Sequence, residues 1–395
     1  MNFLVVCDTF YSDNNSASIQ LTDLSESIAN FHNVDVLTIT YSKESNIFKY
    51  KGINVFKIPV LKTKNINKIL RALNEIIMPF LMIYFIKKND ILKKNYDGII
   101  WYSPSIFFGP LIKFLKKKYD APSYLILRDI FPDWAVDMGL LKKGLVYSIF
   151  KLFEKYQYKQ ANCIGVQVDD NKKYLNNIMN NRGYSVELLN NWLTVSHEDT
   201  FKTSKILNHK IFKRNLKFIY AGNMGHAQDI ETFTNVIKHF NEKDASVGFI
   251  FIGRGDLSKK IKNLSENSQI NNLAYFDEIN RNELALIYKH CNFGLVLLDK
   301  NHRTHNIPGK FISYIHYGLP IFAAINNNND LKKIIENNNL GYSCINNRDE
   351  ILSTMELLLN SHETVKYDNH TLAANEFSTN AARNKIINFF KNYER

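Results

Sequence analysis

The sequence has 395 residues, which is too long for one ordinary hydrophobic core, so two domains are expected. Hydrophobic residues make up 45% of the chain and the formal net charge is +12, which permits two packed cores and favours an anionic partner. No helix-turn-helix, zinc-finger or RNP motif accompanies the positive charge, and this argues against nucleic acid binding.

The cysteines and the N-terminal segment indicate a reducing compartment and no leader. Cys7, Cys163, Cys291 and Cys344 lie far apart without a C-x-x-C pair, so we expect core thiols. The segment MNFLVVCDTF has a short apolar part and no basic leader, unlike a signal peptide. The longest near-apolar run, 76–86, contains a proline and falls short of the roughly 18–20 residues that span a bilayer. We therefore expect a soluble or peripheral cytoplasmic protein.

Strand and helix patterns alternate through the first half of the chain. Short apolar runs predict strands at 3–7, 34–40, 53–60, 97–103, 123–129 and 163–168. Helical spacing predicts helices between them, at 19–29, 66–86, 106–117, 146–158 and 171–179. Several of these strands are almost continuously apolar, as in a parallel sheet that is covered on both faces.

The second half repeats this alternation from a new start. Strands are predicted at 216–222, 246–253, 273–279, 293–298, 320–325 and 341–345. The helices between them are predicted at 229–240, 257–264, 280–291, 308–318 and 330–340. Strictly alternating units predict two doubly wound α/β domains, with the boundary in the polar stretch 194–210.

In such sheets ligands bind beyond the carboxyl ends of the strands, so the loops that follow strands are the places to look for chemistry. After the strand 216–222, Gly222 and Gly225 predict a tight turn with exposed backbone N–H groups, which suits a phosphate or is a plain turn. After the strand 246–253, Arg254 is placed to reach into a cleft. The Arg-Gly-Asp triplet there lies between a core strand and a helix, which argues against an adhesion motif.

The loop after the strand 293–298 carries four polar candidates: Arg303, His305, Asn306 and Lys310. Lys310 follows Pro308 and Gly309 at the start of a predicted helix, where the helix dipole disfavours a cation unless an anion is also bound. The sequence contains no D-x-D triplet, the motif that holds a metal ion in many sugar-nucleotide enzymes. Without it, a pyrophosphate leaving group would be stabilised by Arg254, Lys310 and helix N-termini. We expect no metal site.

In the first half, the strand 123–129 ends with Arg128 and Asp129, and Asp133 follows. This Arg-Asp pair is either a structural ion pair or a polar wall of the cleft. The sequence leaves both alternatives open.

Several stretches together resemble a known family. The segments YAGNMGHAQDIETF, FIGRGDLSKKI, YFDEINRNELALIYKHCNFGLVLL and NIPGKFISYIHYGLPIFA resemble the C-terminal half of glycosyltransferase family 4, in order and spacing. The segment LILRDIFPDWAVDMGLL resembles the matching part of a bacterial O-antigen and capsule subgroup that includes the WbuB-type L-fucosamine transferases. The resemblance covers nearly the whole chain.

The resemblance implies a GT-B fold, in which two Rossmann-like doubly wound domains face a central cleft. Residues 1–195 would bind the acceptor, residues 200–375 would bind the nucleotide-sugar, and a last helix at about 376–395 would cross back to the first domain. It also implies a retaining, metal-independent transferase that needs no cofactor besides its donor substrate, which we expect to be a UDP-sugar.

The resemblance also assigns site residues. Donor binding falls on Gly222, Asn223, Met224, Gly225, Arg254, Glu278, Asn306, Pro308, Gly309, Lys310 and Ser313. Catalytic roles fall on Arg128, Asp129 and His305. The glycine-rich first loop of many relatives is replaced here, so the acceptor-loop candidates are Asp13, Asn14, Asn15 and Ser16. Two glutamates that are usual in the family are missing, because their positions hold His305 and Ser313.

Positive charge is concentrated between Lys51 and Lys118, where 14 Lys or Arg residues face 3 acidic ones and leave a net charge of +11. The apolar run 76–86 lies beside four lysines: Lys87, Lys88, Lys93 and Lys94. An apolar stretch bordered by lysines is typical of an element that lies on a membrane surface. The alternative is a buried helix beside a solvated charged surface.

The sequence thus predicts transfer of a sugar, for which the subgroup suggests an N-acetylated deoxyamino sugar, to a lipid-linked or oligosaccharide acceptor. The acceptor would be met at the cytoplasmic face of the membrane, during O-antigen or capsule synthesis. A nucleotide-sugar 2-epimerase of GT-B architecture is an alternative from a different enzyme class. A non-catalytic nucleotide-sugar-binding protein is a third, which the missing glutamates would permit.

Overall fold

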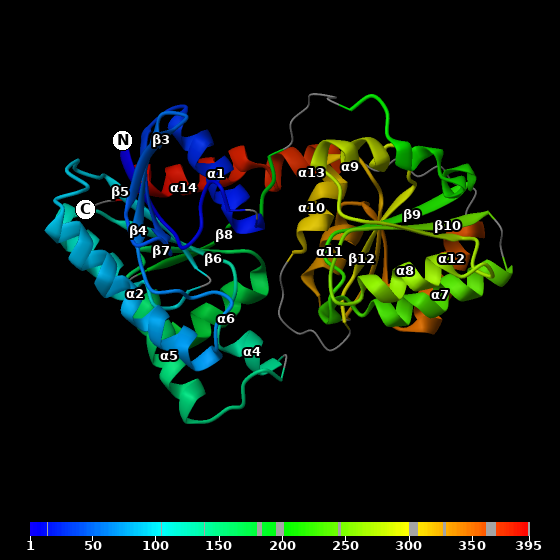
Figure 1. The fold of residues 1–395 in the computed structure, drawn as a ribbon, viewed down its shortest axis with the longest axis horizontal. Helices are drawn as coiled ribbons and strands as arrows, with labels where there is room; N and C mark the ends of the chain where they lie inside the picture. Colours follow the sequence, from blue (N-terminus) through cyan, green and yellow to red (C-terminus); the bar gives the residue numbers. More distant parts are fainter. Residues whose placement is uncertain are drawn as a thin grey trace. The chain divides into compact units, whose positions relative to one another are not determined.

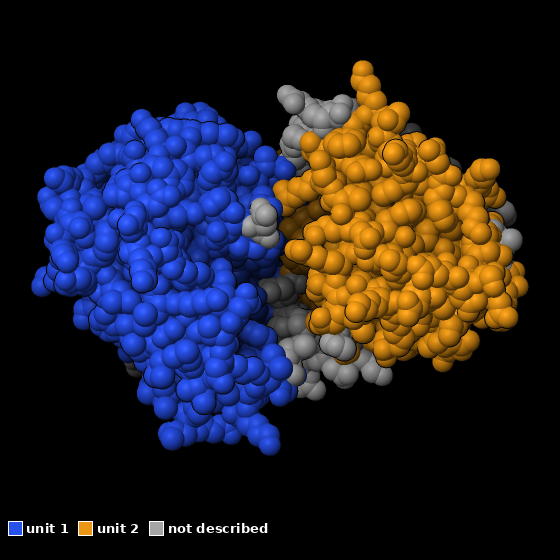
Figure 2. Space-filling model, in the orientation of Figure 1, with its two compact units in different colours: residues 1–194, 378–395 blue, residues 195–377 orange. Residues whose placement is uncertain are grey.

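The protein forms two compact units, which we describe separately (Figure 1). Unit 1 comprises residues 1–194 and 378–395, and unit 2 comprises residues 195–377 (Figure 2). The chain therefore passes from one unit to the other twice. The computed structural model describes residues 1–13, 15–103, 105–137, 139–179, 184–194, 201–243, 246–299, 307–326, 329–360 and 369–393.

Unit 1 is built on an eight-stranded sheet in the order β3-β4-β2-β1-β5-β6-β7-β8. The strands are β1 (Asn2–Val6), β2 (Asn33–Thr40), β3 (Asn46–Tyr50), β4 (Ile53–Pro59), β5 (Gly98–Ser103), β6 (Ser123–Leu127), β7 (Cys163–Val166) and β8 (Ser185–Leu188). All neighbouring pairs are parallel except β3 with β4. Since β1 lies between β2 and β5, the strand order reverses there, and the loops that follow β1 and β5 meet at a topological switch point.

Helices cover both faces of this sheet. They are α1 (Ser16–Ala29), α2 (Lys68–Lys88), α3 (Gly109–Tyr119), α4 (Asp133–Asp137), α5 (Leu145–Tyr158), α6 (Asp169–Met179) and α14 (Thr379–Asn392). One core gathers apolar residues of α1 and α14, and the other gathers those of α2, α3 and α6 with Tyr158 of α5. The strands are buried on both sides because each face has its own helical layer.

The C-terminal helix α14 belongs to unit 1 although it is far away in sequence. The Phe390 ring packs against Phe3 at a centroid distance of 5.1 Å. It also covers Gly98, where an added Cβ would lie 2.5 Å from the ring. The hydroxyls of Thr194 and Thr379 are hydrogen-bonded to each other at 2.6 Å. This bond joins the two points at which the chain leaves unit 1 and returns to it.

Unit 2 has a six-stranded, wholly parallel sheet in the order β11-β10-β9-β12-β13-β14. Its strands are β9 (Leu216–Ala221), β10 (Val247–Ile252), β11 (Leu273–Phe276), β12 (Phe293–Leu297), β13 (Ile321–Ile325) and β14 (Gly341–Ile345). Its helices are α7 (Ile230–Lys243), α8 (Ser258–Glu266), α9 (Arg281–Tyr288), α10 (Gly309–His316), α11 (Asp330–Asn337), α12 (Arg348–Asn360) and α13 (Asn369–Glu376). The switch point of this sheet lies between β9 and β12.

Two doubly wound units are what the alternation predicts, and this prediction is confirmed. All the predicted strands and helices are present, while β3, β8, α4, α12 and α13 were not predicted. Helix α1 begins at Ser16 instead of the predicted residue 19, because the Asn15 side chain accepts a hydrogen bond from the Ser18 amide and caps it. Helix α2 is long and apolar enough to cross a membrane by length and composition alone, which the shorter run 76–86 did not suggest.

Candidate functional site

The loops that follow β9 and β10 are held together backbone to backbone. The Gly222 amide donates to the Ile252 carbonyl at 2.9 Å, and the Met224 amide donates to the Arg254 carbonyl at 2.7 Å. Gly253, at φ +144°, approaches so closely that a Cβ there would lie 2.1 Å from the Gly222 oxygen. This contact requires glycine and fixes the edge of the sheet on which the candidate site is built.

Three amides of the glycine turn are used within the protein, contrary to the expectation that the turn exposes them. The amides of Gly222 and Met224 are used between the two loops, and the Gly225 amide donates to Gln228 Oε1 at 2.9 Å. Helix α7 begins only at Ile230, after a short 3₁₀ turn at His226–Gln228. These three amides are therefore not free for an anion, and further donor groups come from elsewhere at this edge.

Helix α10 supplies such groups. Its N-cap is Pro308, which makes no side-chain capping bond, and its first turn holds no acidic residue. The first amides of a helix have no acceptor one turn earlier in the helix, and they carry the positive end of its dipole. In α10 the Phe311 amide donates to the Pro308 carbonyl at 3.0 Å, so the candidate donors are the amides of Gly309 and Lys310. Gly309 is exposed, and a Cβ there would meet nothing within 4 Å, so packing does not require glycine at this position.

Lys310 lies at the start of the same helix and reaches back to the sheet. Its Nζ donates to Tyr220 Oη at 2.6 Å and lies 3.9 Å from the centroid of the Tyr220 ring. Its Cε is 3.8 Å from the position of a Cβ on Gly222, so the side chain runs along the glycine turn. Tyr220 is buried, and its hydroxyl in turn donates to the Asn223 carbonyl at 2.5 Å. Lysine, tyrosine and turn are thus one hydrogen-bonded chain.

No carboxylate among the described residues pairs with Lys310. Burial of its ammonium lowers the pKa of Lys310 from 10.5 to about 7. An anion that binds beside this buried cation stabilises it, because the anion replaces the interactions with water that burial removed.

Arg254 and Glu278 come from the loops after β10 and β11. The Arg254 Nε lies 3.1 Å from Glu278 Oε2, and both side chains are more than half exposed. An exposed pair of this kind contributes little to stability, so Arg254 can exchange its partner for a ligand. Ser313, which stands where relatives have a glutamate, donates its hydroxyl to the Gly309 carbonyl at 3.2 Å.

Tyr314 anchors α10 on the sheet, and sequence reasoning missed it. Its buried hydroxyl accepts from the Ala221 amide at 3.0 Å and donates to the Ile219 carbonyl at 3.2 Å, at the switch point. A Cβ on Gly294 would lie 2.4 Å from the Tyr314 ring, so the glycine in β12 makes room for it. Glycine inside an apolar strand is the signal that could have revealed this close approach.

Asn14, Arg303, His305 and Asn306 lie outside the described residues. The other acceptor-loop candidates bind one another: Thr9 Oγ1 donates to Asp13 Oδ2 at 2.7 Å, and Asn15 Nδ2 donates to Thr9 Oγ1 at 2.9 Å. Ser16 is the first residue of α1. These contacts give Asp13 and Asn15 a structural part in shaping the loop after β1.

Arg128 is held by amide side chains. Its Nη1 donates to Asn191 Oδ1 at 2.5 Å and also to Gln20 Oε1. Gln20 in turn donates to the Trp192 carbonyl at 2.8 Å. Arg128 therefore ties the end of β6 to α1 and to the segment after β8, while Asp129 follows it in the loop.

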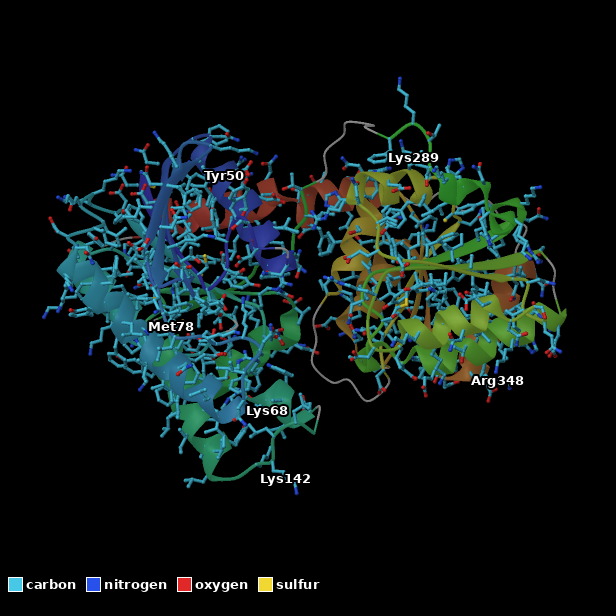
Figure 3. The ribbon with its side chains drawn as sticks, viewed as in Figure 1. Tyr50, Lys68, Met78, Lys142, Lys289 and Arg348 are labelled. Atoms are coloured by element: carbon cyan, nitrogen blue, oxygen red, sulfur yellow. The ribbon has the colours of Figure 1, made fainter. Side chains whose placement is uncertain are left out.

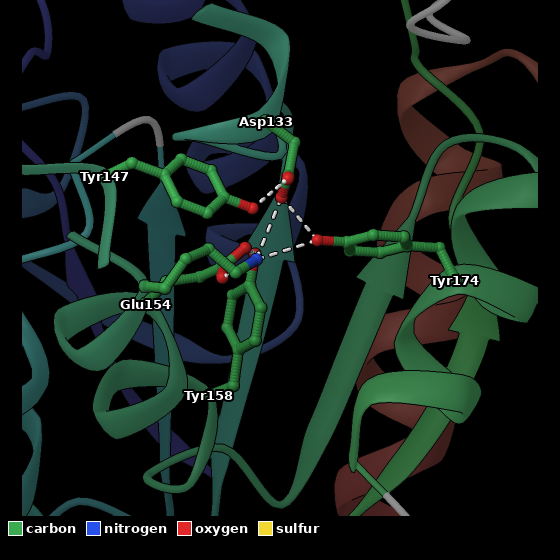
Figure 4. Close-up of polar contacts among 6 residues, drawn as sticks. Asp133, Tyr147, Glu154, Tyr158 and Tyr174 are labelled. Atoms are coloured by element: carbon green, nitrogen blue, oxygen red, sulfur yellow. Dashed lines mark hydrogen bonds and ion pairs between the residues drawn. The ribbon is translucent and has the colours of Figure 1, made fainter. Parts of the chain in front are cut away.

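Asp133 is the centre of a separate network that joins α4, α5 and α6 (Figure 4). It accepts hydrogen bonds from Tyr147 at 2.8 Å and from Tyr174, and it pairs with Lys151 at 2.8 Å. Lys151 also pairs with the buried Glu154. Hydrogen bonds from these partners lower the pKa of Asp133 against the opposing effect of burial, whereas burial raises the pKa of Glu154 to about 7.

Asp8 is a further acidic residue that sequence reasoning missed. It follows β1 at the switch point of unit 1, and its Oδ1 is buried without a hydrogen-bond partner among the described residues. Burial raises the pKa of Asp8, and burial also raises the pKa of Glu75 on α2, which interacts electrostatically with Asp8. No cluster of three or more His, Cys, Asp or Glu side chains in the described ranges is arranged to hold a metal ion.

The four lysines of the predicted membrane patch have different surroundings. Lys93 lies 3.3 Å from Asp90, and Lys94 lies 2.9 Å from the buried Asp35. Lys87 and Lys88, at the end of α2, lie over the rings of Phe114 and Tyr84.

The chain is similar in sequence to known glycosyltransferases. Residues 202–371 match the family model described as "Glycosyl transferases group 1". The chain is 25% identical over 227 residues to "Probable glycosyltransferase WbjE" of Pseudomonas aeruginosa, which covers 56% of this chain and 55% of the relative. The chain spans about half the length of the curated relatives it matches.

Solved structures match over the whole chain at low identity. WaaG, "a glycosyltransferase involved in lipopolysaccharide biosynthesis", superposes with a TM-score of 0.65 at 11% identity, covering 99% of this chain and 100% of that one. Alr3699/HepE of Anabaena, solved in complex with UDP, gives a TM-score of 0.67 at 11% identity and covers 100% of both chains. The protein therefore has the GT-B fold, and residues 202–371 form a glycosyl transferases group 1 domain.

Proposed function

We propose that this chain transfers a sugar from a nucleotide diphosphate donor, expected to be a UDP-sugar, to a lipid-linked or oligosaccharide acceptor. The proposal places the reaction at the cytoplasmic face of the membrane, in the synthesis of an O-antigen or capsule. It includes retention at the anomeric carbon, independence of metal ions, and membership of family 4 near the WbuB-type enzymes. An N-acetylated deoxyamino sugar is the donor sugar that this subgroup suggests.

The observation that carries the proposal is the surroundings of Lys310. The ammonium lies at the positive end of α10, beside the turn after β9, with a pKa lowered to about 7 and no carboxylate partner among the described residues. Such an arrangement is unfavourable in the free protein and becomes favourable when a diphosphate binds.

The same groups can assist departure of the nucleotide. As the bond between sugar and diphosphate breaks, negative charge grows on the diphosphate oxygen that leaves. The Lys310 ammonium and the first amides of α10 stabilise this charge more than that of the bound donor, which lowers the barrier. Arg254, once released from Glu278, supplies a second cation.

One relative supports the activity, and one solved structure supports the setting of the reaction. WbjE is named a probable glycosyltransferase, and WaaG is described as acting in lipopolysaccharide biosynthesis. The structure of HepE with UDP supports a uridine nucleotide as the first donor class to test.

The test is incubation of the purified chain with a panel of UDP-sugars, with and without EDTA, followed by NMR. We expect slow release of UDP together with a free sugar, and the first-formed anomer should keep the donor's configuration. The rate should be the same in EDTA. An inverted first-formed anomer would contradict retention, and a strict requirement for Mn²⁺ would contradict metal independence.

A nucleotide-sugar 2-epimerase remains the second candidate, and one observation favours it. Asp8 and Glu75 are acidic groups whose pKa values are raised by burial, and a raised pKa suits a carboxyl group that exchanges protons. The same incubation separates the alternatives, because an epimerase would give the C2 epimer of the donor. Binding without any product would indicate a nucleotide-sugar-binding protein.

A further inference from the structure

Helix α2 exposes a long apolar stripe. Ile69, Leu73, Ile77, Phe80 and Tyr84 follow one another at helical spacing, and their exposed fractions are between 41% and 74%. The opposite side of the helix packs into the core of unit 1 through Met78, Met82 and Ile86. The stripe is therefore a second apolar face, additional to the one that folding buries.

Helix α5 also exposes apolar side chains, although its Phe150 and Phe153 pack inward against Phe107. Its exposed side carries Leu145, Val146, Ile149, Leu152 and Tyr156, with exposed fractions between 36% and 79%. Its buried residues, in contrast, are polar or amphipathic: Glu154, Gln157 and Tyr158. A helix that buries a carboxyl group and exposes leucine has its outer surface suited to an apolar environment.

The two stripes belong to one region of unit 1. Helix α3 packs against both α2 and α5, and the ribbon shows the two helices on the same side of the sheet (Figure 1). Of the 19 large hydrophobic residues that the described chain exposes, 12 lie on α2, α5 or at Leu140 just before α5, and only Leu357 is in unit 2. The apolar exposure is therefore concentrated in one place.

The charges around these stripes favour an anionic partner. Helix α2 carries Lys68 at its start and Lys87 and Lys88 at its end, while its acid Glu75 is 15% exposed and paired with Arg71. Four lysines accompany α5 on its surface: Lys142, Lys143, Lys155 and Lys159. Figure 3 labels Lys68, the first residue of α2, and Lys142, which lies in the segment before α5.

From these observations we propose that the α2–α5 face, defined as the exposed stripes of α2 and α5, docks on an anionic lipid bilayer. The apolar side chains enter the interface between headgroups and acyl chains, and the surrounding lysines contact anionic headgroups. The α2 helix lies along the surface and does not cross it, because Met78, Met82 and Ile86 would otherwise have to leave the core.

This proposal extends the membrane location within the proposed function, and it changes the residues that bring it about. The two lysines with carboxylate partners, Lys93 and Lys94, are less available to lipids than the apolar stripes. The test below uses neither donor nor acceptor, so its failure and the failure of the sugar-transfer proposal are distinguishable.

The experiment is sedimentation of the full chain with vesicles of phosphatidylcholine alone or mixed with phosphatidylglycerol. One variant carries Leu73→Gln, Ile77→Gln and Phe80→Gln, and a second carries Leu145→Gln, Ile149→Gln and Leu152→Gln. The matched control carries the same change at exposed apolar residues elsewhere: Phe31→Gln, Ile47→Gln and Leu357→Gln. Circular dichroism verifies that all three variants fold.

We expect each stripe variant to lower partitioning into mixed vesicles by about tenfold or more, whereas the control binds as the parent does. Raising the salt to about 0.5 M should weaken binding of the parent but leave a fraction bound, because apolar insertion is not screened. Equal binding of the stripe variants and the parent would overturn the proposal. Vesicle binding that resists alkaline carbonate would also overturn it, because such resistance indicates a helix that spans the membrane. A third contrary result would be that the parent is a dimer, and that the stripe variants are monomers that still bind vesicles as the parent does.

Discussion

Lys310 is a cation in a place where burial disfavours charge, and this has a measurable consequence for stability. Its pKa is about 7 in the folded chain and near 10.5 when unfolded, so between these values the unfolded state binds more protons. Stability therefore rises with pH from about 7 to about 10.5 on account of this group, and the full penalty is present below pH 7.

Replacing Lys310 with methionine should remove that penalty. At pH 6.5 we expect Lys310→Met to raise the free energy of unfolding by roughly 1–3 kcal/mol, less than the full shift because the side chain is partly exposed. At pH 9.5 the gain should be smaller. Urea unfolding at both pH values measures the difference, with the exposed Lys260→Met as a control. A variant that is less stable than the parent at both pH values would contradict this account.

Loss of the Lys310 side chain should also lower the rate of donor turnover. Lys310→Ala should reduce the turnover of the donor by about 10²–10³-fold, as expected when one group that stabilises developing charge is removed. Arg254→Ala should lose less, about tenfold, because its guanidinium is exposed and paired with Glu278. Turnover is measured as UDP release, and near-parental rates in Lys310→Ala would show that the residue has another role.

At the scale of elements, the sequence predicted the site in part. Helix α10 could be located because Pro308 and Gly309 mark its start and Gly318 marks its end. Lys310, the lysine in its first turn, indicated that an anion binds there. The contact of Gly253 with Gly222 could not be predicted, because it joins two loops whose spacing depends on the register of β9 and β10. Tyr314 was missed for the same reason, since its partners lie on other strands.

The backbone contact between the two loops can be tested with glycine substitutions. Gly253→Ala places a Cβ 2.1 Å from the Gly222 carbonyl oxygen at a positive φ, so we expect a loss of about 3 kcal/mol or more in unfolding free energy. Gly144→Ala, where the Cβ meets nothing within 4 Å, is the control, and because Gly144 is the N-cap of α5 it should lose no more than about 1 kcal/mol. Thermal unfolding distinguishes them, and a Gly253→Ala chain as stable as the control would show that the loops separate easily.

At the scale of the whole molecule, the alternation of strands and helices was sufficient to predict two doubly wound units. The return of the last helix to unit 1 was expected only from the family resemblance. Periodicity could not predict it, because the pattern of α14 does not say which sheet its apolar side will cover. The residues that decide this are Gly98 and Phe3, which lie far away in sequence and receive Phe390.

Removing that helix should damage unit 1 more than unit 2. A chain that ends at residue 377 loses the buried Ile386, Ile387 and Phe390 and leaves the α1 side of the unit 1 sheet partly uncovered. Each such side chain contributes about 1.5–3 kcal/mol, so we expect unit 1 to unfold or aggregate. Limited proteolysis should then cleave within residues 1–194 first. Equal protection of both units would contradict the assignment of α14 to the core of unit 1.

The central claim is that the Lys310 edge of unit 2 binds a nucleotide diphosphate, and calorimetric titration with UDP at pH 8 tests it most directly. Two buffers of different ionisation enthalpy reveal proton transfer. Because Lys310 is mostly neutral at this pH and a diphosphate favours its charged form, UDP should bind the parent with uptake of a fraction of a proton. Lys310→Ala should bind about tenfold or more weakly, without that uptake. Binding of UDP to the parent and to Lys310→Ala with the same affinity and the same proton balance would contradict the claim.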